Sequence, residues 1–253
     1  MEQDEQYLKK HLIDLSRRAE NKNIVTYSNF LNLNELSVLC QAKYELDCPY
    51  ELYGGYEHAE RKMAAFLPSS HSFVVEKADY PISAVSLNPL HQKFAEDFTH
   101  RDVLGSLMGL GMKREMLGDI IVKDAKAIIF CADSICGYLT EQCSQVRRTM
   151  VRCEKISISD FTYEPSFLEK EGTVASFRLD TIIADVCKLT RSHAQKVISE
   201  GNAFINSQKI LSKDYICRDG DVLSVRHHRK YIIETSDKTS RKGKMKYRYK
   251  IYM

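Results

Sequence analysis

The stretch from about Phe73 to Phe161 constrains the fold most, because strand-like and helix-like patterns follow one another there in a fixed order. Short apolar runs between turn residues predict strands, and apolar residues spaced three or four apart predict helices. Thr99 and Asp102 have the spacing of a capping box, which predicts that a helix begins there. The expected elements are a strand over 85–88 continuing an apolar run from Ile82, a helix over 98–109, strands over 119–122 and 127–131, a helix over 133–143 and a strand over 150–158. This order predicts a half-sandwich, in which helices cover one face of a four-stranded sheet.

The two central strands of that sheet, GDIIV and AIIFCA, bear on whether it contacts RNA. The order β-α-β-β-α-β is that of ferredoxin-like and RRM-like domains. RRMs bind RNA through exposed aromatic side chains on their central strands. Phe130 is the one aromatic residue in the two strands here. We therefore expect a spacer or docking role for this domain and no RNA recognition by its sheet.

The segment before residue 73 predicts a mixed α+β domain. Apolar stripes at helical spacing alternate there with a short strand-like run that ends in two glycines. Asn32 or Asn34 can cap the second of the helices. The expected elements are helices over 5–20 and 33–44, a strand over 50–54 and a helix over 57–66 that ends before Pro68.

Charge is distributed unevenly along the chain. From Thr173 to the end there are 17 Lys and Arg residues against 8 Asp and Glu, a net charge of +9. The first 172 residues carry 20 against 26, a net charge of −6. A basic end on an acidic body indicates a polyanionic partner for that end, or a solvated basic tail that aids solubility.

Cysteine usage and hydropathy indicate a reducing compartment. The eight cysteines include no CxxC pair, so neither a zinc ribbon nor a thioredoxin-type site is supported. They are expected to be reduced, partly buried thiols. The sequence shows no secretory signal and no apolar run long enough to span a bilayer. We expect a cytoplasmic protein without metal, cofactor or membrane contact.

The basic end predicts two helices followed by a sheet. The first helix carries an apolar face that begins at Leu179, and the second runs over 191–200, with Thr190 as its cap and Gly201 just after its end. Arg191, Ser192 and Lys196 lie on the side of the second helix away from its apolar stripe. A helix N-terminus with a hydroxyl and cations beside it is suited to bind phosphate.

The remaining residues predict short strands and a terminal hairpin. The expected strands cover 203–206, 209–210, 222–226, 231–235 and 247–252. In the last strand, Tyr247 and Tyr249 share one side, whereas Arg248, Lys250 and Tyr252 share the other. From residue 226 onward there are ten basic and two acidic residues. Tyrosines interleaved with cations suit base stacking on RNA, or ordinary sheet packing.

Several of these residues match the pattern of a known RNA-binding module. The segment resembles the small RNA-binding domain first described in the fourth protein of the small ribosomal subunit. One departure is that many members have a glycine-containing turn where this chain has His227, His228 and Arg229. The matching positions, over about 50 residues, are Arg178-Leu179-Asp180, Arg191-Ser192, Ala194, Ile198, Gly201, Ile205-Asn206, Gly220-Asp221 and Val225-Arg226.

Nearly the whole chain is also similar to the YlmH proteins of Gram-positive bacteria. The matching stretches are Gly54–Tyr56, Ala59–Lys62, Phe98–Gly111 and Gly118–Ile120. The resemblance implies a C-terminal domain that binds ribosomal RNA and tRNA. It also implies ribosome-associated quality control on large subunits that still hold peptidyl-tRNA, in support of alanine tailing of stalled chains. An older link of this family to cell division rests on gene neighbourhood.

These observations predict a fold and a binding site. The fold class is α+β with three small domains: a mixed N-terminal α+β domain over 1–72, an RRM-like domain over 73–163 and a C-terminal RNA-binding domain over 173–253. The polar stretch 164–172 is expected to be a linker. The residues expected to contact RNA are Arg178, Arg191, Ser192, Lys196, Lys209, Arg226, Arg229 and Lys230, presented by turns at Gly201, Asn206, Gly220 and Asp221. The expected protein is not an enzyme, and it is monomeric off the ribosome.

Two other function classes stay open. An RNA-modifying enzyme would need an active site in the N-terminal half, and Gly105–Gly111 fits helix packing better than a cofactor loop. Asp180 lies inside the small module, where a structural role is expected. The third class is a cell-division adaptor that binds protein through the acidic body. The small clusters considered for acid–base or metal chemistry are His58 with Glu57 and Glu60, His100 with Asp102, and His227 with His228; solvated, helix-start or phosphate-contact roles are expected for them.

Overall fold

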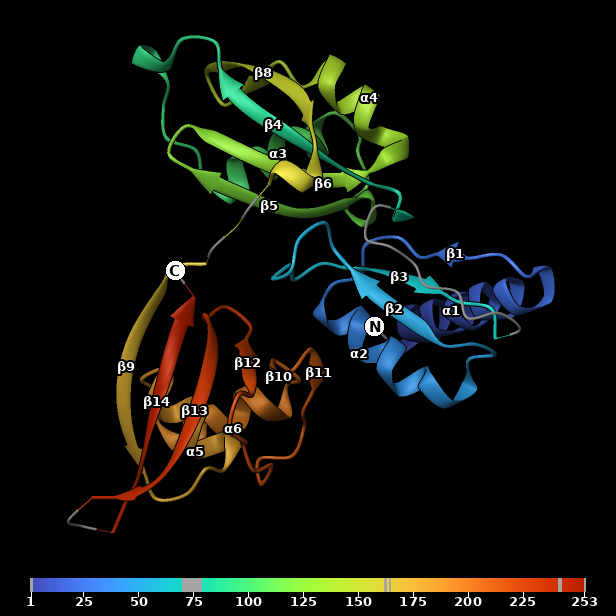
Figure 1. The fold of residues 1–253 in the computed structure, drawn as a ribbon. Coiled ribbons are helices and arrows are strands. Elements are labelled where there is room, and N and C mark those ends of the chain that lie inside the picture. The colour runs from blue at the N-terminus through green and yellow to red at the C-terminus, as the bar shows by residue number, and fades with distance from the viewer. Residues whose placement is uncertain (1, 70–78, 162, 164, 241–242, 253) are drawn as a thin grey trace. The chain divides into compact units, whose positions relative to one another are not determined.

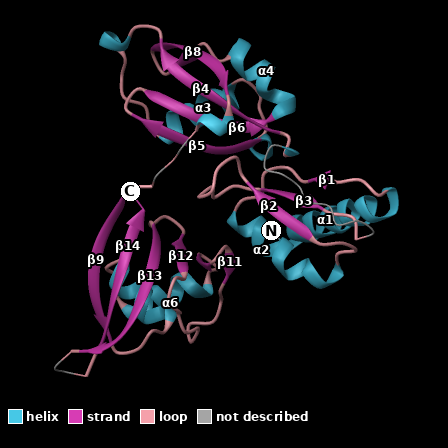
Figure 2. Cartoon of the chain, in the orientation of Figure 1, coloured by secondary structure: helices cyan, strands magenta, loops and turns pink. Residues whose placement is uncertain are grey.

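The computed structural model describes residues 2–69, 79–161, 163, 165–240 and 243–252. The chain forms two compact units, residues 1–163 and 164–253 (Figures 1 and 2). Helices and antiparallel sheets occur in both units, which confirms the α+β class. None of the helices in the described residues is long and apolar enough to cross a membrane.

The first unit begins with a three-stranded sheet and two helices. The helices are α1 (Glu2–Lys22) and α2 (Leu33–Gln41), followed by a 3-10 turn at Ala42–Glu45. The strands are β1 (Thr26–Tyr27), β2 (Tyr50–Tyr53) and β3 (Met63–Phe66), in the order β1-β3-β2. Asn32 caps α2 in a capping box with Glu35, as one of the two predicted caps.

The helix predicted over 57–66 is wrong. Residues 63–66 form the central strand β3, and all four of them are buried. Residues 57–62 form turns and bends, in which the backbone N–H groups of Glu60 and Arg61 donate to the Asp119 carboxylate at 2.7 and 3.0 Å. A strand buried on both faces has no polar alternation, so its apolar run resembles a helix segment in sequence.

The second part of this unit has the predicted order of elements. The strands are β4 (Ile82–Pro89), β5 (Leu117–Lys123), β6 (Lys126–Ala132), β7 (Gln145–Val146) and β8 (Thr149–Ile156). The helices are α3 (His100–Gly109) and α4 (Asp133–Gln142), with 3-10 turns at Gln92–Phe94, Arg114–Met116 and Ile158–Asp160. The sheet order β5-β6-β4-β8-β7 places β4 and β6 next to each other inside the sheet, as in an RRM-like half-sandwich. The expectation that GDIIV is a central strand is wrong, because this run lies in the edge strand β5, and the short strand β7 adds a fifth strand to the expected four.

The two faces of this sheet are covered differently. On one face, Val85, Leu87 and Ile129 share a core with Val103 of α3 and Leu139 of α4. On the other face, Phe30, Met63 and Ala65 from the first 72 residues pack against the central strands. They share a core with Tyr80, with Ile82 and Ala84 of β4, and with Phe130 and Ala132 of β6. Residues 70–78 lie outside the described part of the chain, so the domain boundary expected at 72–73 stays a prediction.

The second unit is a six-stranded antiparallel sheet with two helices. The helices are α5 (Leu179–Val186) and α6 (Arg191–Ser199). The strands are β9 (Phe167–Val174), β10 (Ala203–Ile205), β11 (Gln208–Lys209), β12 (Val222–Val225), β13 (Lys230–Thr239) and β14 (Met245–Tyr252), in the order β11-β10-β12-β13-β14-β9. Helix α6 follows Thr190, whose hydroxyl accepts from the His193 N–H, and it precedes Gly201 with φ +71°, as predicted.

The linker predicted over 164–172 is wrong, because β9 occupies most of it. Strand β9 pairs with β14 over eight residues, from Phe167 opposite Tyr252 to Val174 opposite Met245. Glu169 and Glu171 lie opposite Lys250 and Arg248. An edge strand that is exposed over most of its length lacks apolar alternation, and its partner is about 80 residues away in sequence.

Candidate nucleic-acid interface

A buried carboxylate organises the start of α6. The Asp180 side chain is fully buried, and its Oδ2 accepts from Nε of Arg191 at 2.9 Å and from Nε2 of Gln195 at 2.8 Å. Arg178 donates to the same carboxylate, from Nε to Oδ1 at 3.2 Å. Burial by itself raises the pKa of Asp180, but the hydrogen bonds from Gln195, Arg178 and Arg191 outweigh it and hold the pKa well below its ordinary value. Asp180 is therefore an anionic anchor that brings two of the predicted RNA-contacting arginines together.

Arg178 and Arg191 differ in how much of the guanidinium is exposed and free of ion pairs to bind a ligand. Arg178 also forms an ion pair with Asp214, and its side chain is 31% exposed. The Arg191 side chain is 59% exposed. Ser192, beside Arg191, is exposed in the first turn of α6, and its hydroxyl lies 3.1 Å from that of Thr190. Arg191 is thus better placed for a phosphate than Arg178, whose charge is balanced by two carboxylates.

Lys196, Lys209 and the backbone of Arg226 lie further along α6 or at its C-terminal end. Lys196 is exposed on α6 and lies 3.8 Å from Glu200. The Arg226 N–H donates to the Asn202 carbonyl oxygen, just beyond the end of α6. A Cβ on Gly201 would lie 3.3 Å from Cδ of Lys209, so Lys209 reaches the same end. Arg191 and Lys196 therefore lie along one short helix, about 13 Å long for nine residues, and Lys209 reaches its C-terminal end.

Asn206 and Asp221 hold the turns of the sheet, as expected. Asn206, with φ +50°, donates from Nδ2 to Asp221 Oδ1 at 2.9 Å, and its Oδ1 accepts from the Val222 N–H. Asp221, nearly buried, also accepts from the Arg218 N–H at 2.8 Å. Gly220 has φ +79°, a conformation that favours glycine.

The turn between β12 and β13 keeps a glycine-like backbone without a glycine. His227 has φ +66°, and the His228 N–H donates to the Val225 carbonyl oxygen. Arg226, His227, His228 and Arg229 are all exposed. The departure from the family pattern thus leaves a tight turn in place and adds two imidazoles to its surface.

Replacing His227 with glycine is expected to stabilise the protein by up to about 1 kcal/mol, because a side chain in the left-handed region costs about that much. Urea denaturation would measure the change. His228→Gly is the matched control, since His228 does not have positive φ and should gain nothing. A destabilised His227→Gly variant would show that the His227 side chain holds the turn.

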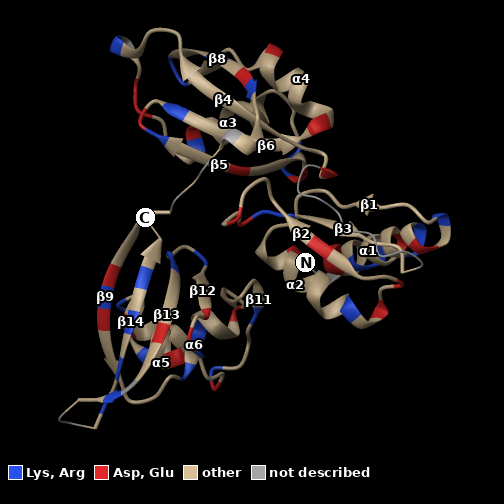
Figure 3. Cartoon of the chain, in the orientation of Figure 1, with Lys and Arg blue, Asp and Glu red and all other residues tan. Residues whose placement is uncertain are grey.

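Sheet packing occupies most of the tyrosine rings. Tyr231, Tyr247 and Tyr249 are 4%, 1% and 2% exposed, so they are not available for base stacking. The Tyr247 hydroxyl donates to Asp185 at 2.6 Å, and a Cβ on Gly172 would lie only 2.3 Å from the Tyr247 ring. Tyr252 is half-buried, and its ring lies under the Lys230 ammonium at 4.7 Å. The hypothesis that these buried rings stack on bases is therefore wrong. RNA contact through the Lys and Arg residues of this unit, which Figure 3 marks in blue, stays a prediction.

Sequence reasoning missed two contacts of this network, one made by Asp180 and one made by Arg178. Gln195 binds the Asp180 anchor, and Asp214 pairs with Arg178 at 2.5 Å. The spacing of Arg191 and Gln195, four residues apart on one helix face, was the available signal for a shared partner. No comparable signal relates Asp214 to Arg178, because the contact depends on how the loop before β12 returns.

In the first unit, the family-like motifs converge on one junction. The Asp119 carboxylate accepts from the Tyr56 hydroxyl at 2.8 Å as well as from two backbone N–H groups. Arg61 is 8% exposed, and its guanidinium donates to the carbonyl oxygens of Leu117, Phe30 and Arg114 at 2.8–3.1 Å. The motifs therefore hold the N-terminal segment on the central sheet.

The junction removes Phe130 from solvent. Phe130 is fully buried, stacked on Tyr56 with ring centroids 5.0 Å apart. Gly55 has φ +98°, and a Cβ there would lie 2.3 Å from the Phe130 ring. The aromatic position through which an RRM would bind RNA is thus part of a protein core. Lys123, Lys126 and Arg152 lie on the same sheet face toward the other end of its strands, and they are exposed.

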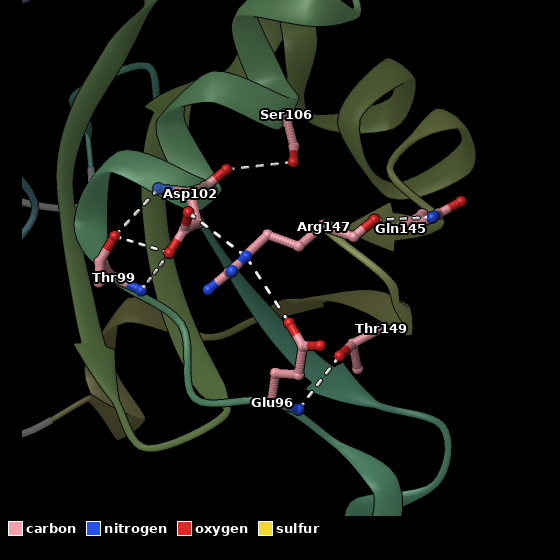
Figure 4. Close-up of polar contacts among 7 residues, drawn as sticks. All are labelled: Glu96, Thr99, Asp102, Ser106, Gln145, Arg147 and Thr149. Carbon is pink, nitrogen blue, oxygen red and sulfur yellow. Dashed lines mark hydrogen bonds and ion pairs between the residues drawn. The ribbon is translucent and has the colours of Figure 1, made fainter.

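The start of α3 is a structural network. Figure 4 shows Asp102 bonded to Thr99, with Oδ2 accepting from the Thr99 N–H at 2.9 Å, which confirms the predicted capping box. Arg147 lies 3.8 Å from Asp102 and 3.6 Å from Glu96. Hydrogen bonds from Thr99 lower the pKa of Asp102, so the carboxylate stays ionised. Its partners in the figure are those of a helix start.

The other clusters considered for chemistry are not assembled as sites. His58, Glu57 and Glu60 lie in a turn, and the Glu60 N–H belongs to the Asp119 network. Within the described residues, no group of three or more His, Cys, Asp or Glu side chains is placed to hold a metal ion. All eight cysteines, which fall in the described ranges, are free thiols, and six of them are buried.

Comparison with known proteins adds three findings. Residues 76–160 match a family model described as "Putative RNA-binding domain in YlmH". The chain is similar to the ribosome-associated protein quality control protein P2 of Bacillus subtilis (strain 168), with 27% identity over 227 residues that cover 88% of this chain and 86% of that protein. Its fold is similar to that of cell division protein ylmH from Streptococcus pneumoniae, with a TM-score of 0.52 and 17% identity, over 62% of this chain and 93% of that one.

The family description bears on one expectation. It describes the segment that matches residues 76–160 as a "Putative RNA-binding domain", whereas the sequence favoured a spacer or docking role for this domain, so the match does not support that preference. The burial of Phe130 limits any such binding to the uncovered part of the sheet and to the loops.

Proposed function

Because the chain belongs to the YlmH family of RNA-binding proteins, we propose that it acts on the ribosome as an RNA-binding factor that catalyses no reaction. The ribosomal part of this proposal comes from the similarity to the protein from Bacillus subtilis, whose name gives that protein a role in ribosome-associated protein quality control. An RNA-binding, ribosome-associated role agrees with the basic C-terminal unit. Its place of action would be the cytoplasm.

The finer proposal concerns the particle and the reaction it supports. The protein would dock on large subunits that still hold peptidyl-tRNA, contact ribosomal RNA and tRNA, and support alanine tailing of the stalled chain. The observation that carries the RNA-binding part is the exposed cationic surface of α6, anchored by Asp180. Arg191, Ser192 and Lys196 would contact phosphates there, and Lys209, Arg226, Arg229 and Lys230 would extend the contact beyond the helix, with Arg178 supporting it.

Reversing two charges on α6 tests this proposal. The variant Arg191→Glu/Lys196→Glu is expected to weaken binding to large ribosomal subunits by about 100-fold, because each lost phosphate contact also ends the release of a counterion. Co-sedimentation of the variant protein at physiological salt, with large ribosomal subunits from cells with stalled translation, measures the loss.

The matched control is Lys10→Glu/Lys43→Glu, which changes the charge equally at exposed positions of the first unit. Sedimentation of the α6 variant equal to that of the wild type would contradict the proposal. A separate comparison of ribosomal RNA modifications with and without the gene tests for catalysis, since one lost modification would indicate an RNA-modifying enzyme.

A further inference from the structure

The tip of the β13–β14 hairpin carries a second group of cations, which we call the hairpin tip. From Lys238 to Lys246 the sequence has basic residues at 238, 241, 242, 244 and 246 and no acidic residue; Asp237 precedes it. Lys238, Lys244 and Lys246 are exposed. Among the side chains that the structure describes, these three lysines form no ion pair within 4 Å.

The middle of the same hairpin is electrically balanced. Lys250 lies 2.7 Å from Glu234 and 3.8 Å from Glu169 on the neighbouring strands. Arg248 lies 3.6 Å from Glu234 and opposite Glu171 of β9. Arg248 and Lys250 are therefore neutralised within the sheet, and β9 supplies part of the negative charge.

The hairpin thus separates two basic ends. One end is the turn between β12 and β13 with Arg226 and Arg229, and the other is the hairpin tip (Figure 1). Strand β13 connects them with ten residues, which corresponds to about 30 Å at about 3.3 Å per residue. This distance is too long for one phosphate group, or two adjacent ones, to reach both ends.

The surface next to the hairpin tip is hollowed and polar. A depression of about 980 Å³ is lined there by Lys238, Lys246, Arg248, Thr173, Thr235 and Ser236, together with Glu171, Glu234, Gly172 and Tyr247. Hydroxyl groups beside lysines are donors of the kind that contact phosphate and sugar oxygens. Met245, 37% exposed, is the one exposed large apolar residue of the described tip, so the surface lacks the apolar face with which a peptide inserts into a membrane.

We propose that the hairpin tip is a second phosphate-binding surface, and that the C-terminal unit contacts two backbone segments of one folded RNA about 30 Å apart. The inference rests on the proposed RNA-binding function and extends it to the kind of RNA. A ligand held at both ends must present phosphates at that separation, which a folded RNA does through its shape. The balanced middle of the hairpin spans the distance without fixing the ligand there.

The test uses the full-length protein and deproteinised large-subunit ribosomal RNA as the probe. The variant Lys238→Glu/Lys244→Glu/Lys246→Glu is expected to bind this RNA at least about tenfold more weakly, with a salt-dependence slope smaller by about 2–3, close to 0.9 for each lost phosphate contact. The turn variant Arg226→Glu/Arg229→Glu is expected to lower the slope as well. Combining the two sets should add the two reductions, because the sites are far apart.

The control is Lys10→Glu/Lys22→Glu/Lys43→Glu, which changes the charge equally at exposed positions of the first unit. Affinity and slope of the tip variant equal to those of this control would overturn the inference. A tip variant that binds RNA normally but no longer sediments with ribosomes would also overturn it, because the tip would then contact protein. A turn variant that binds the RNA as the wild type does would overturn the two-ended contact alone. If Arg191→Glu/Lys196→Glu also binds the RNA as tightly as the wild type, the proposed function itself fails.

Discussion

Replacing Asp180 with alanine is expected to lower the free energy of unfolding of residues 164–253 by about 3–5 kcal/mol. Asp180 is fully buried and accepts hydrogen bonds from Arg178, Arg191 and Gln195. Its removal leaves those donors without their acceptor and opens a cavity between the starts of α5 and α6. Urea denaturation followed by circular dichroism measures the loss, since the chain has no tryptophan.

The same substitution should reduce RNA binding in a way that a loss of stability alone does not. Without the carboxylate, Arg191 loses the partner that fixes its Nε, so its guanidinium is no longer oriented toward the ligand. Asp180→Asn, which keeps the shape of the side chain, is the control for the cavity. A folded Asp180→Asn protein with unchanged RNA affinity at low temperature would contradict the orienting role and leave only a structural one.

The acid sensitivity of the unit follows from the same carboxylate. Because the pKa of Asp180 is lowered in the folded state, its contribution to stability is complete above its unfolded pKa of about 3.9. The contribution is lost as the pH falls from there toward the folded pKa. Unfolding free energies of the wild type should therefore drop below about pH 4 more steeply than those of Asp180→Asn, and equal slopes would contradict the assignment.

Replacing Arg61 with methionine is expected to lower the free energy of unfolding of residues 1–163 by about 3–5 kcal/mol. Methionine fills much of the volume but leaves the carbonyl oxygens of Leu117 and Phe30 without the donors that satisfy them. The loss should be accompanied by exposure of the Phe130 core, measured by limited proteolysis and by binding of an apolar dye. Calorimetry measures the stability.

Arg61→Lys is the informative control. Lysine keeps the charge but cannot donate in the fixed fork geometry of a guanidinium, so it should recover only part of the stability. Full recovery by lysine would show that the charge matters and the hydrogen-bond geometry does not. Wild-type stability of Arg61→Met would contradict the view that this side chain joins the N-terminal segment to the sheet.

The sequence was sufficient where local signals agree with one another. The order of elements over 82–156 could be predicted because each strand is a short apolar run and α3 begins with the Thr99 capping box. Helices α5 and α6 could be predicted for the same reason, with Thr190 and Gly201 marking the limits of α6. The turn-forming roles of Asn206 and Asp221 followed from their residue types.

Where a structure depends on a distant partner, the sequence was not sufficient. Strand β9 is formed by charged residues whose pairing with β14 depends on residues far along the chain. The segment 57–66 was predicted as a helix because nothing local indicates that Asp119 binds its backbone. In the candidate interface, the cations could be identified from the sequence. Which of them are held by a carboxylate and which stay exposed could be seen only from the positions of Asp180, Asp214, Glu234 and Glu169 in the structure.

The Asp119 junction also sets an order in which the first unit can mature during synthesis. When the first 72 residues have been made, Phe30, Met63 and Ala65 exist, but the strands β4 and β6 that bury them do not. The backbone N–H groups of Glu60 and Arg61 have no acceptor from Asp119 until that residue is synthesised, almost 60 residues later. The nascent N-terminal segment therefore exposes apolar surface until β6 emerges, so this interval is where a pause in elongation would leave the protein most open to aggregation or proteolysis.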